Sequence, residues 1–122
     1  MANNKTRVMY IEHKGDRISG SARIGRVVYS KSGQSLYYQG RRFQTLTGRG
    51  FKSNYFELDT GDHYWISGCK KLGGDRLYPG TIEIDENVRE EYWLKIRKKP
   101  EDVAKKIIRC AGKHGGKAKG AK

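Results

Sequence analysis

Apolar and polar residues alternate along much of the first two thirds of this chain, a pattern that is typical of half-buried β-strands. The segment 22–30 shows the pattern well, because Ile24 and Val28 are predicted to share one face while Val27 points the other way. Gly25 lies in the middle of this segment. A glycine inside a strand indicates a bend or a close backbone approach.

Short alternating runs recur and are separated by residues that favour turns. Gly33 and Gly61 lie in two such turns, where each can supply a positive φ. Six strands with tight turns predict a mainly β fold, namely a small SH3-like antiparallel barrel, with an OB-like barrel as the alternative. Its interior is predicted to hold Ile24, Val28, Leu36, Trp65 and Ile82. The strands are expected at Val8–Glu12, Ala22–Ser30, 35–46 counted as one, Asn54–Leu58, His63–Ser67 and Thr81–Asp85.

The last third has helical periodicity. Asp85 is a suitable N-cap for a helix over 86–97, whose apolar face carries Val88, Tyr92 and Ile96 and is widened by Trp93 and Leu94. Pro100 fits the first turn of a second helix over 100–111, with Val103, Ile107 and Ala111 on one face. The segment 113–122 contains only Lys, Gly, Ala and one His, so it is expected to be disordered.

The length of 122 residues suits one domain, predicted over 1–112 with the barrel at 7–85. The two cysteines, Cys69 and Cys110, are too few for a disulfide framework, and we interpret them as reduced thiols of a cytoplasmic protein. No apolar run approaches the length of a membrane span, and the N-terminus lacks the apolar stretch of a secretory signal.

The distribution of charge indicates the kind of partner. The net charge of +13 is divided into three blocks along the chain. Residues 1–53 hold eleven Lys and Arg against two acids, residues 54–94 hold four against nine, and residues 95–122 hold eleven against two. Concentrated positive charge attracts polyanions and releases their counterions on binding. A nucleic acid is therefore the expected partner.

The candidate binding surface combines cations with aromatic rings on consecutive predicted strands, where Tyr29, Tyr38 and Phe43 accompany the basic residues. Lys and Arg contact phosphates, and an exposed ring can stack on a base. The alternative is that the rings form the core and the cations are only solvated. The predicted nucleic-acid-binding residues are Arg23, Arg26, Lys31, Tyr37, Arg41, Arg42, Arg49 and Lys52, with Lys113, Lys117, Lys119 and Lys122 of the tail.

Other constellations have simpler explanations. The glycines around Arg49 suit a hairpin connection, although their N–H groups could also meet an anion. Cys69 lies beside two lysines, which could lower its pKa, but a structural cysteine is the preferred interpretation. The histidines and cysteines form no close pair with metal-ligand spacing. No catalytic residues, metal or other cofactor are predicted.

Several segments resemble a family of small uncharacterised bacterial proteins. The resemblance covers roughly residues 9–97 and implies no established function. Members often carry the label 1-deoxy-D-xylulose-5-phosphate synthase, an enzyme that uses thiamine diphosphate. Such an enzyme needs large domains and a Gly-Asp-Gly motif, whereas this chain has Gly61-Asp62-His63, so that activity is not expected here. The segments are 9–14, 22–27, 37–41, 54–56, 64–68 and 85–93.

The sequence therefore predicts non-catalytic binding of nucleic acid, driven by phosphate contacts. A protein-interaction module, in which the acidic middle segment and exposed Tyr or Trp side chains dock a partner, is the alternative. An enzyme or an enzyme subunit is a third, weaker possibility. DNA and RNA are not distinguished, and the oligomeric state is not predicted.

Overall fold

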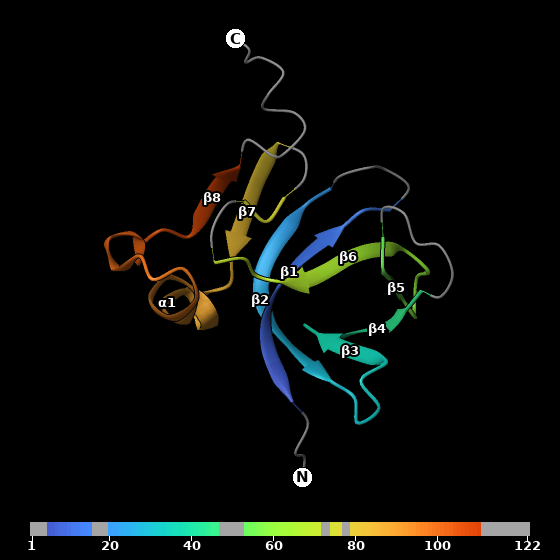
Figure 1. The fold of residues 1–122 in the computed structure, drawn as a ribbon. Coiled ribbons are helices and arrows are strands. Elements are labelled where there is room, and N and C mark those ends of the chain that lie inside the picture. The colour runs from blue at the N-terminus through green and yellow to red at the C-terminus, as the bar shows by residue number, and fades with distance from the viewer. Residues whose placement is uncertain (1–4, 16–19, 47–52, 72–73, 77–78, 111–122) are drawn as a thin grey trace.

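The computed structural model describes residues 5–15, 20–46, 53–71, 74–76 and 79–110. Six strands form a closed antiparallel barrel in which consecutive strands pair and the last pairs with the first (Figure 1). The predicted mainly β barrel is thus confirmed. The six are β1 (Thr6–His13), β2 (Ala22–Tyr29), β3 (Ser35–Tyr38), β4 (Arg41–Thr45), β5 (Tyr55–Glu57) and β6 (His63–Gly68).

The turns follow the glycines. Gly33 and Gly61 have φ values of 80° and 78°, as the turn prediction requires. The segment 35–46, expected as one strand, is instead two strands joined by the two-residue turn Gln39-Gly40. Both turn residues have positive φ, which is the signature of a type I′ hairpin.

Strand β7 (Gly80–Ile84) does not belong to the ring, which corrects the prediction that it closes the barrel. It pairs in parallel with the first half of β2. The second half of β2 pairs with β3 along the same edge. The free edge of β7 is covered by β8 (Ile107–Cys110). Figure 1 shows β7 and β8 with the helix beside the barrel.

Within 79–110, the described part of the C-terminal third, the structure has one helix rather than two. It runs through η1 (Glu86–Val88), α1 (Arg89–Glu91) and the π-helical η2 (Tyr92–Ile96). Val88, Tyr92 and Trp93 are buried as predicted, but Leu94 is 44% exposed. The prediction of a second helix over 100–111 is wrong. That region forms the short 3-10 turn η3 (Pro100–Asp102) and then strand β8. Ala111 lies outside the described residues.

The buried apolar residues form two cores on opposite faces of β1 and β2. Of the five predicted interior residues, Leu36 lies in the barrel core, Ile24 and Ile82 are buried in the outer core, and Val28 and Trp65 are only half-buried. We call the first cluster the barrel core, which comprises Met9, Ile11, Val27, Leu36, Tyr38, Phe43, Tyr64 and Ile66. The outer core lies under β7 and the helix and comprises Val8, Tyr10, Ala22, Ile24, Ile82, Ile84, Val88, Tyr92 and Trp93.

Candidate functional site: paired arginines, free cations and a polar pocket

The predicted strand arginines are all paired with carboxylates of the acidic middle block. Arg41 donates to both oxygens of Glu57 at 3.0 Å, and Arg42 Nη2 lies 3.1 Å from Asp59 Oδ1. Arg26 pairs with Glu91 of α1. The basic and acidic blocks therefore neutralise each other across the fold, which a reading along the chain does not reveal.

Arg23 is the most extensively held of these arginines. Its guanidinium group contacts Glu83 Oε1 at 2.7 Å and Asp85 Oδ1 at 2.7 Å and 2.8 Å. The hydrogen bond to Asp85 raises the pKa of Arg23, so the side chain is charged at any physiological pH. A phosphate that recruits Arg23 has to compete with two carboxylates.

A second set of cations forms no ion pair with a carboxylate among the described residues. Each member is exposed, and half of them lie in the stretch 95–109, from the end of η2 to β8. We call this set the free cations. They are Lys5, Arg7, Lys31, Lys70, Lys71, Lys95, Lys98, Lys99, Lys106 and Arg109.

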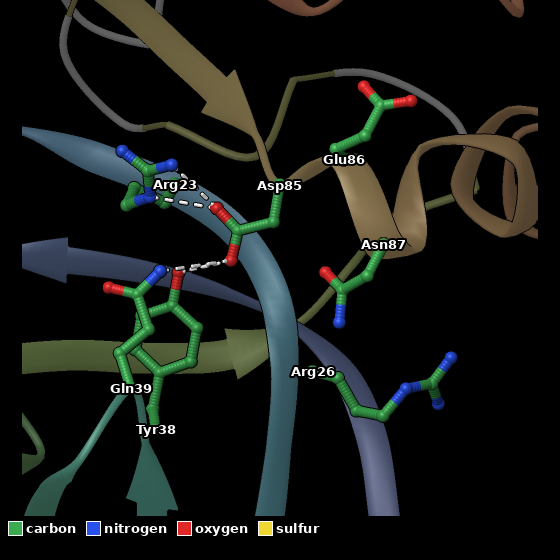
Figure 2. A pocket seen from close by; sticks show the side chains of 7 residues that line it. All are labelled: Arg23, Arg26, Tyr38, Gln39, Asp85, Glu86 and Asn87. Carbon is green, nitrogen blue, oxygen red and sulfur yellow. Dashed lines mark hydrogen bonds and ion pairs between the residues drawn. The ribbon is translucent and has the colours of Figure 1, made fainter.

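A polar pocket of about 440 Å³ opens where β2, the β3–β4 turn and the β7–η1 junction meet (Figure 2). Two of the predicted binding residues, Arg23 and Arg26, line it together with the buried Tyr38. Nothing in the sequence indicates that these three segments meet, because β7 begins 51 residues after the end of β2 (80 − 29). The full lining is Arg23, Arg26, Tyr38, Gln39, Asp85, Glu86 and Asn87.

Asp85 organises this pocket. Besides Arg23, its carboxylate accepts a hydrogen bond of 2.6 Å from the Tyr38 hydroxyl and a longer one of 3.4 Å from Gln39 Nε2 (Figure 2). Burial, and then the bond to Asp85, raises the pKa of Tyr38 well above its usual value, so the phenol stays a neutral donor. Asp85 does occupy the predicted N-cap position, but its side chain makes no capping hydrogen bond.

Gly25 lies beneath this network. A Cβ built there would lie 2.4 Å from Tyr38 Cε1 and 2.5 Å from Asp85 Oδ2. The close backbone approach predicted from a glycine inside a strand is therefore confirmed, and it is an approach of β2 to the pocket side chains.

The aromatic residues of the candidate surface divide sharply. Tyr37 is 39% exposed, whereas Tyr38 and Phe43 belong to the barrel core and Tyr29 packs partly against it. For Tyr38 and Phe43, the alternative interpretation as core rings is correct. Tyr37 keeps the exposure that base stacking requires.

Burial also decides the chemistry of Cys69. The thiol packs against the outer core and approaches the Val8 carbonyl oxygen at 3.7 Å. Desolvation raises its pKa to about 12, so the neighbouring lysines do not activate it. The structural interpretation of this cysteine is the one that its surroundings support.

A buried charge cluster was missed by the sequence analysis. Glu12, Lys14 and Arg76 are each about 5% exposed or less, and Lys14 Nζ lies 3.6 Å from Glu12 Oε2. The Tyr10 hydroxyl donates to Glu12 Oε1 at 2.5 Å, and Arg76 donates to the Gly20 carbonyl oxygen at 2.9 Å. A glutamate at the end of an apolar strand was the available signal. The cluster ties strand β1 to the segment that precedes β7.

Several predicted binding residues fall outside the described part of the chain, and no metal centre emerges within it. Among the residues that the structure describes, no group of three or more His, Cys, Asp or Glu side chains could hold a metal ion. Within the same part of the chain, no helix has the length and apolar character needed to cross a membrane. The residues outside it are Arg49, Lys52, Lys113, Lys117, Lys119 and Lys122.

Comparison with known proteins returned no matching family model, curated protein or solved structure.

Proposed function

We propose that this protein binds nucleic acid without catalysis, mainly through contacts with phosphates. The observation that carries this proposal is the set of ten exposed free cations, which remains after most of the described acids have been paired. Cations without a carboxylate partner are the ones that a phosphate backbone can recruit most readily.

Small barrels include the OB-fold, which presents one strand face and the adjoining loops to oligonucleotides. An OB-like barrel follows a Greek key, whereas here consecutive strands pair all round the ring. We therefore favour the SH3-like kind over the OB-like kind.

We expect most of the phosphate contacts in the C-terminal part of the chain. Lys95, Lys98, Lys99, Lys106 and Arg109 are free cations of the C-terminal stretch, and the four tail lysines follow directly in sequence. The strand arginines stay candidates, but each has to exchange a carboxylate for a phosphate. Exposed ion pairs contribute little to stability, so such an exchange costs little where both partners are solvated, as for Arg42 and Asp59.

Two variants with the same reduction in charge test this proposal. One replaces three free cations, Lys98, Lys106 and Arg109, with Gln, and the other replaces Arg23, Arg41 and Arg42 with Gln. The free-cation variant should bind DNA and RNA of unrelated sequences more weakly than the other, because phosphate contacts position without specifying. Its slope of log affinity against log salt should become shallower by up to about one unit for each phosphate that the variant no longer binds.

Fluorescence anisotropy with labelled strands at several salt concentrations measures both quantities, and circular dichroism checks that each variant is folded. The strand variant should show a smaller change in slope than the free-cation variant. Unchanged affinity and slope in both variants would contradict nucleic-acid binding by this surface and would favour the protein-interaction alternative.

A further inference from the structure

The polar pocket differs from the rest of the basic surface because its charges are already satisfied. Arg23 is held by Glu83 and Asp85, and Arg26 by Glu91. Asp85 accepts from Arg23, Tyr38 and Gln39, and both oxygens of Glu86 accept from Arg89, at 3.0 Å and 2.6 Å. A ligand of this pocket therefore meets little net charge.

Two amide side chains are left to recognise such a ligand. Asn87 is exposed and its amide makes no hydrogen bond to any described residue. Gln39 donates its Nε2 to Asp85, which orients the amide so that Oε1 points away from the carboxylate (Figure 2). The pocket thus presents one complete donor–acceptor pair and one further acceptor.

The backbone at Gln39 points to the same site. This residue has a φ of 51° in the first position of the β3–β4 turn, where Asn or Gly is the favoured residue. A non-glycine residue in the left-handed region raises the conformational energy of the backbone. The longer glutamine side chain brings its amide to Asp85 and to the pocket, which a glycine could not do.

By the side-chain pairings known from the major groove of DNA, the free groups match one base better than the others. Guanine is usually read by arginine and cytosine by a carboxylate, and these groups are engaged here. Adenine is read by Asn or Gln, which accept from N6 and donate to N7. Resting on the function proposed above, we propose that this pocket receives an adenine base, with Asn87 as its principal reader and Gln39 as a second acceptor.

The first test compares labelled pyrimidine single strands that carry one central adenine, guanine, cytosine or thymine, measured by anisotropy at moderate salt. The wild type should bind the adenine strand about fivefold or more tightly than the others, as one bidentate contact provides. Asn87→Ala should remove this preference while the affinity for the thymine strand and the salt slope stay unchanged. Gln44→Ala, which removes an exposed amide from β4 outside the pocket, is the matched control and should keep the preference.

Two further measurements keep the outcomes distinct. Gln39→Asn relieves the turn and shortens the amide, so it should reduce the preference for adenine without loss of stability. Adenosine monophosphate, titrated alone by calorimetry, identifies the source of the base: affinity equal to that of the adenine strand assigns the pocket to the free nucleotide, and much weaker affinity assigns it to adenine within a strand.

Equal binding of all four strands by the wild type, together with no binding of adenosine monophosphate, would overturn the adenine pocket. A preference that survives in Asn87→Ala would overturn the role of Asn87. In both cases salt-dependent binding would remain intact, so failure of the pocket is separable from failure of the proposed function. Absence of any salt-dependent binding would overturn both.

Discussion

At the scale of single residues, Asp85 joins segments that are far apart in sequence. Its carboxylate holds Arg23 of β2, Tyr38 of β3 and Gln39 of the following turn. These side chains can gather only because β2 carries no side chain at Gly25, directly beneath them. Gly25 is thus required for close approach, and its role does not depend on a positive φ.

Gly25→Ala should therefore destabilise the fold. The added methyl group would lie 2.4 Å from the Tyr38 ring and 2.5 Å from the Asp85 carboxylate, so both side chains would have to move. Overpacking of this kind costs about 1–3 kcal/mol. The free energy of unfolding in urea measures the effect.

Gly74→Ala is the control for this substitution, because a Cβ at that position meets nothing closer than Cys110 Sγ at 3.8 Å. The control should unfold at nearly the wild-type urea concentration. Equal stability of the two alanine variants would contradict the close approach at Gly25.

At the scale of elements, strand β8 replaces the second helix because of the sheet beside it. The spacing of Val103, Ile107 and Ala111 has helical period, but residues 108–110 also alternate between apolar and polar. In the structure Ile107 is 55% exposed, whereas Ile108 packs against the outer core. Pairing with β8 satisfies the backbone groups of β7 that would otherwise form an open edge, and local periodicity does not register this gain.

The two isoleucines give a direct test of strand against helix. Ile108→Ala should cost about 2 kcal/mol of unfolding free energy, the low end for a buried isoleucine, because the side chain is only half-buried. Ile107→Ala should change stability by less than about 0.5 kcal/mol, as expected for a surface position. Thermal or urea unfolding measures the stability of both variants. A greater loss of stability in Ile107→Ala than in Ile108→Ala would favour the helix.

At the scale of the whole molecule, the two cores and the charge pairs have a common origin. Strand β1 is buried on both faces because the barrel lies on one side and β7 with the helix on the other. The same arrangement brings Glu83, Asp85 and Glu91 to the arginines of β2. The arginines in the middle of β2 are therefore neutralised by carboxylates, and the unpaired positive charge lies on the free cations.

Deletion of Lys113–Lys122 tests the whole-molecule charge. The segment has no apolar side chain larger than alanine, so its removal should leave the melting temperature nearly unchanged. Binding of DNA or RNA should weaken, because four lysines are removed. Scanning calorimetry and anisotropy measure the two effects, and a truncation that unfolds the domain would show that the tail is part of the folded unit.

Local patterns were sufficient for much of this fold. Alternation placed five segments that form the barrel, of which 35–46 divides into β3 and β4, and Gly33 and Gly61 marked two of the turns, since these features depend on neighbours in sequence. Gly25 signalled a close approach, but the groups that approach it, Tyr38 and Asp85, come from distant segments. The charge blocks were equally visible, because net charge is a property of composition.

Only the tertiary structure decided which charges are free and which rings are exposed. Arg42 and Lys98 are both exposed cations, yet Asp59 lies beside the first and no described acid beside the second. Tyr37 and Tyr38 are adjacent tyrosines, yet one faces solvent and the other joins the barrel core. Ion pairing and burial depend on residues brought together from distant parts of the chain, and the pocket around Asp85 exists only where three such segments meet.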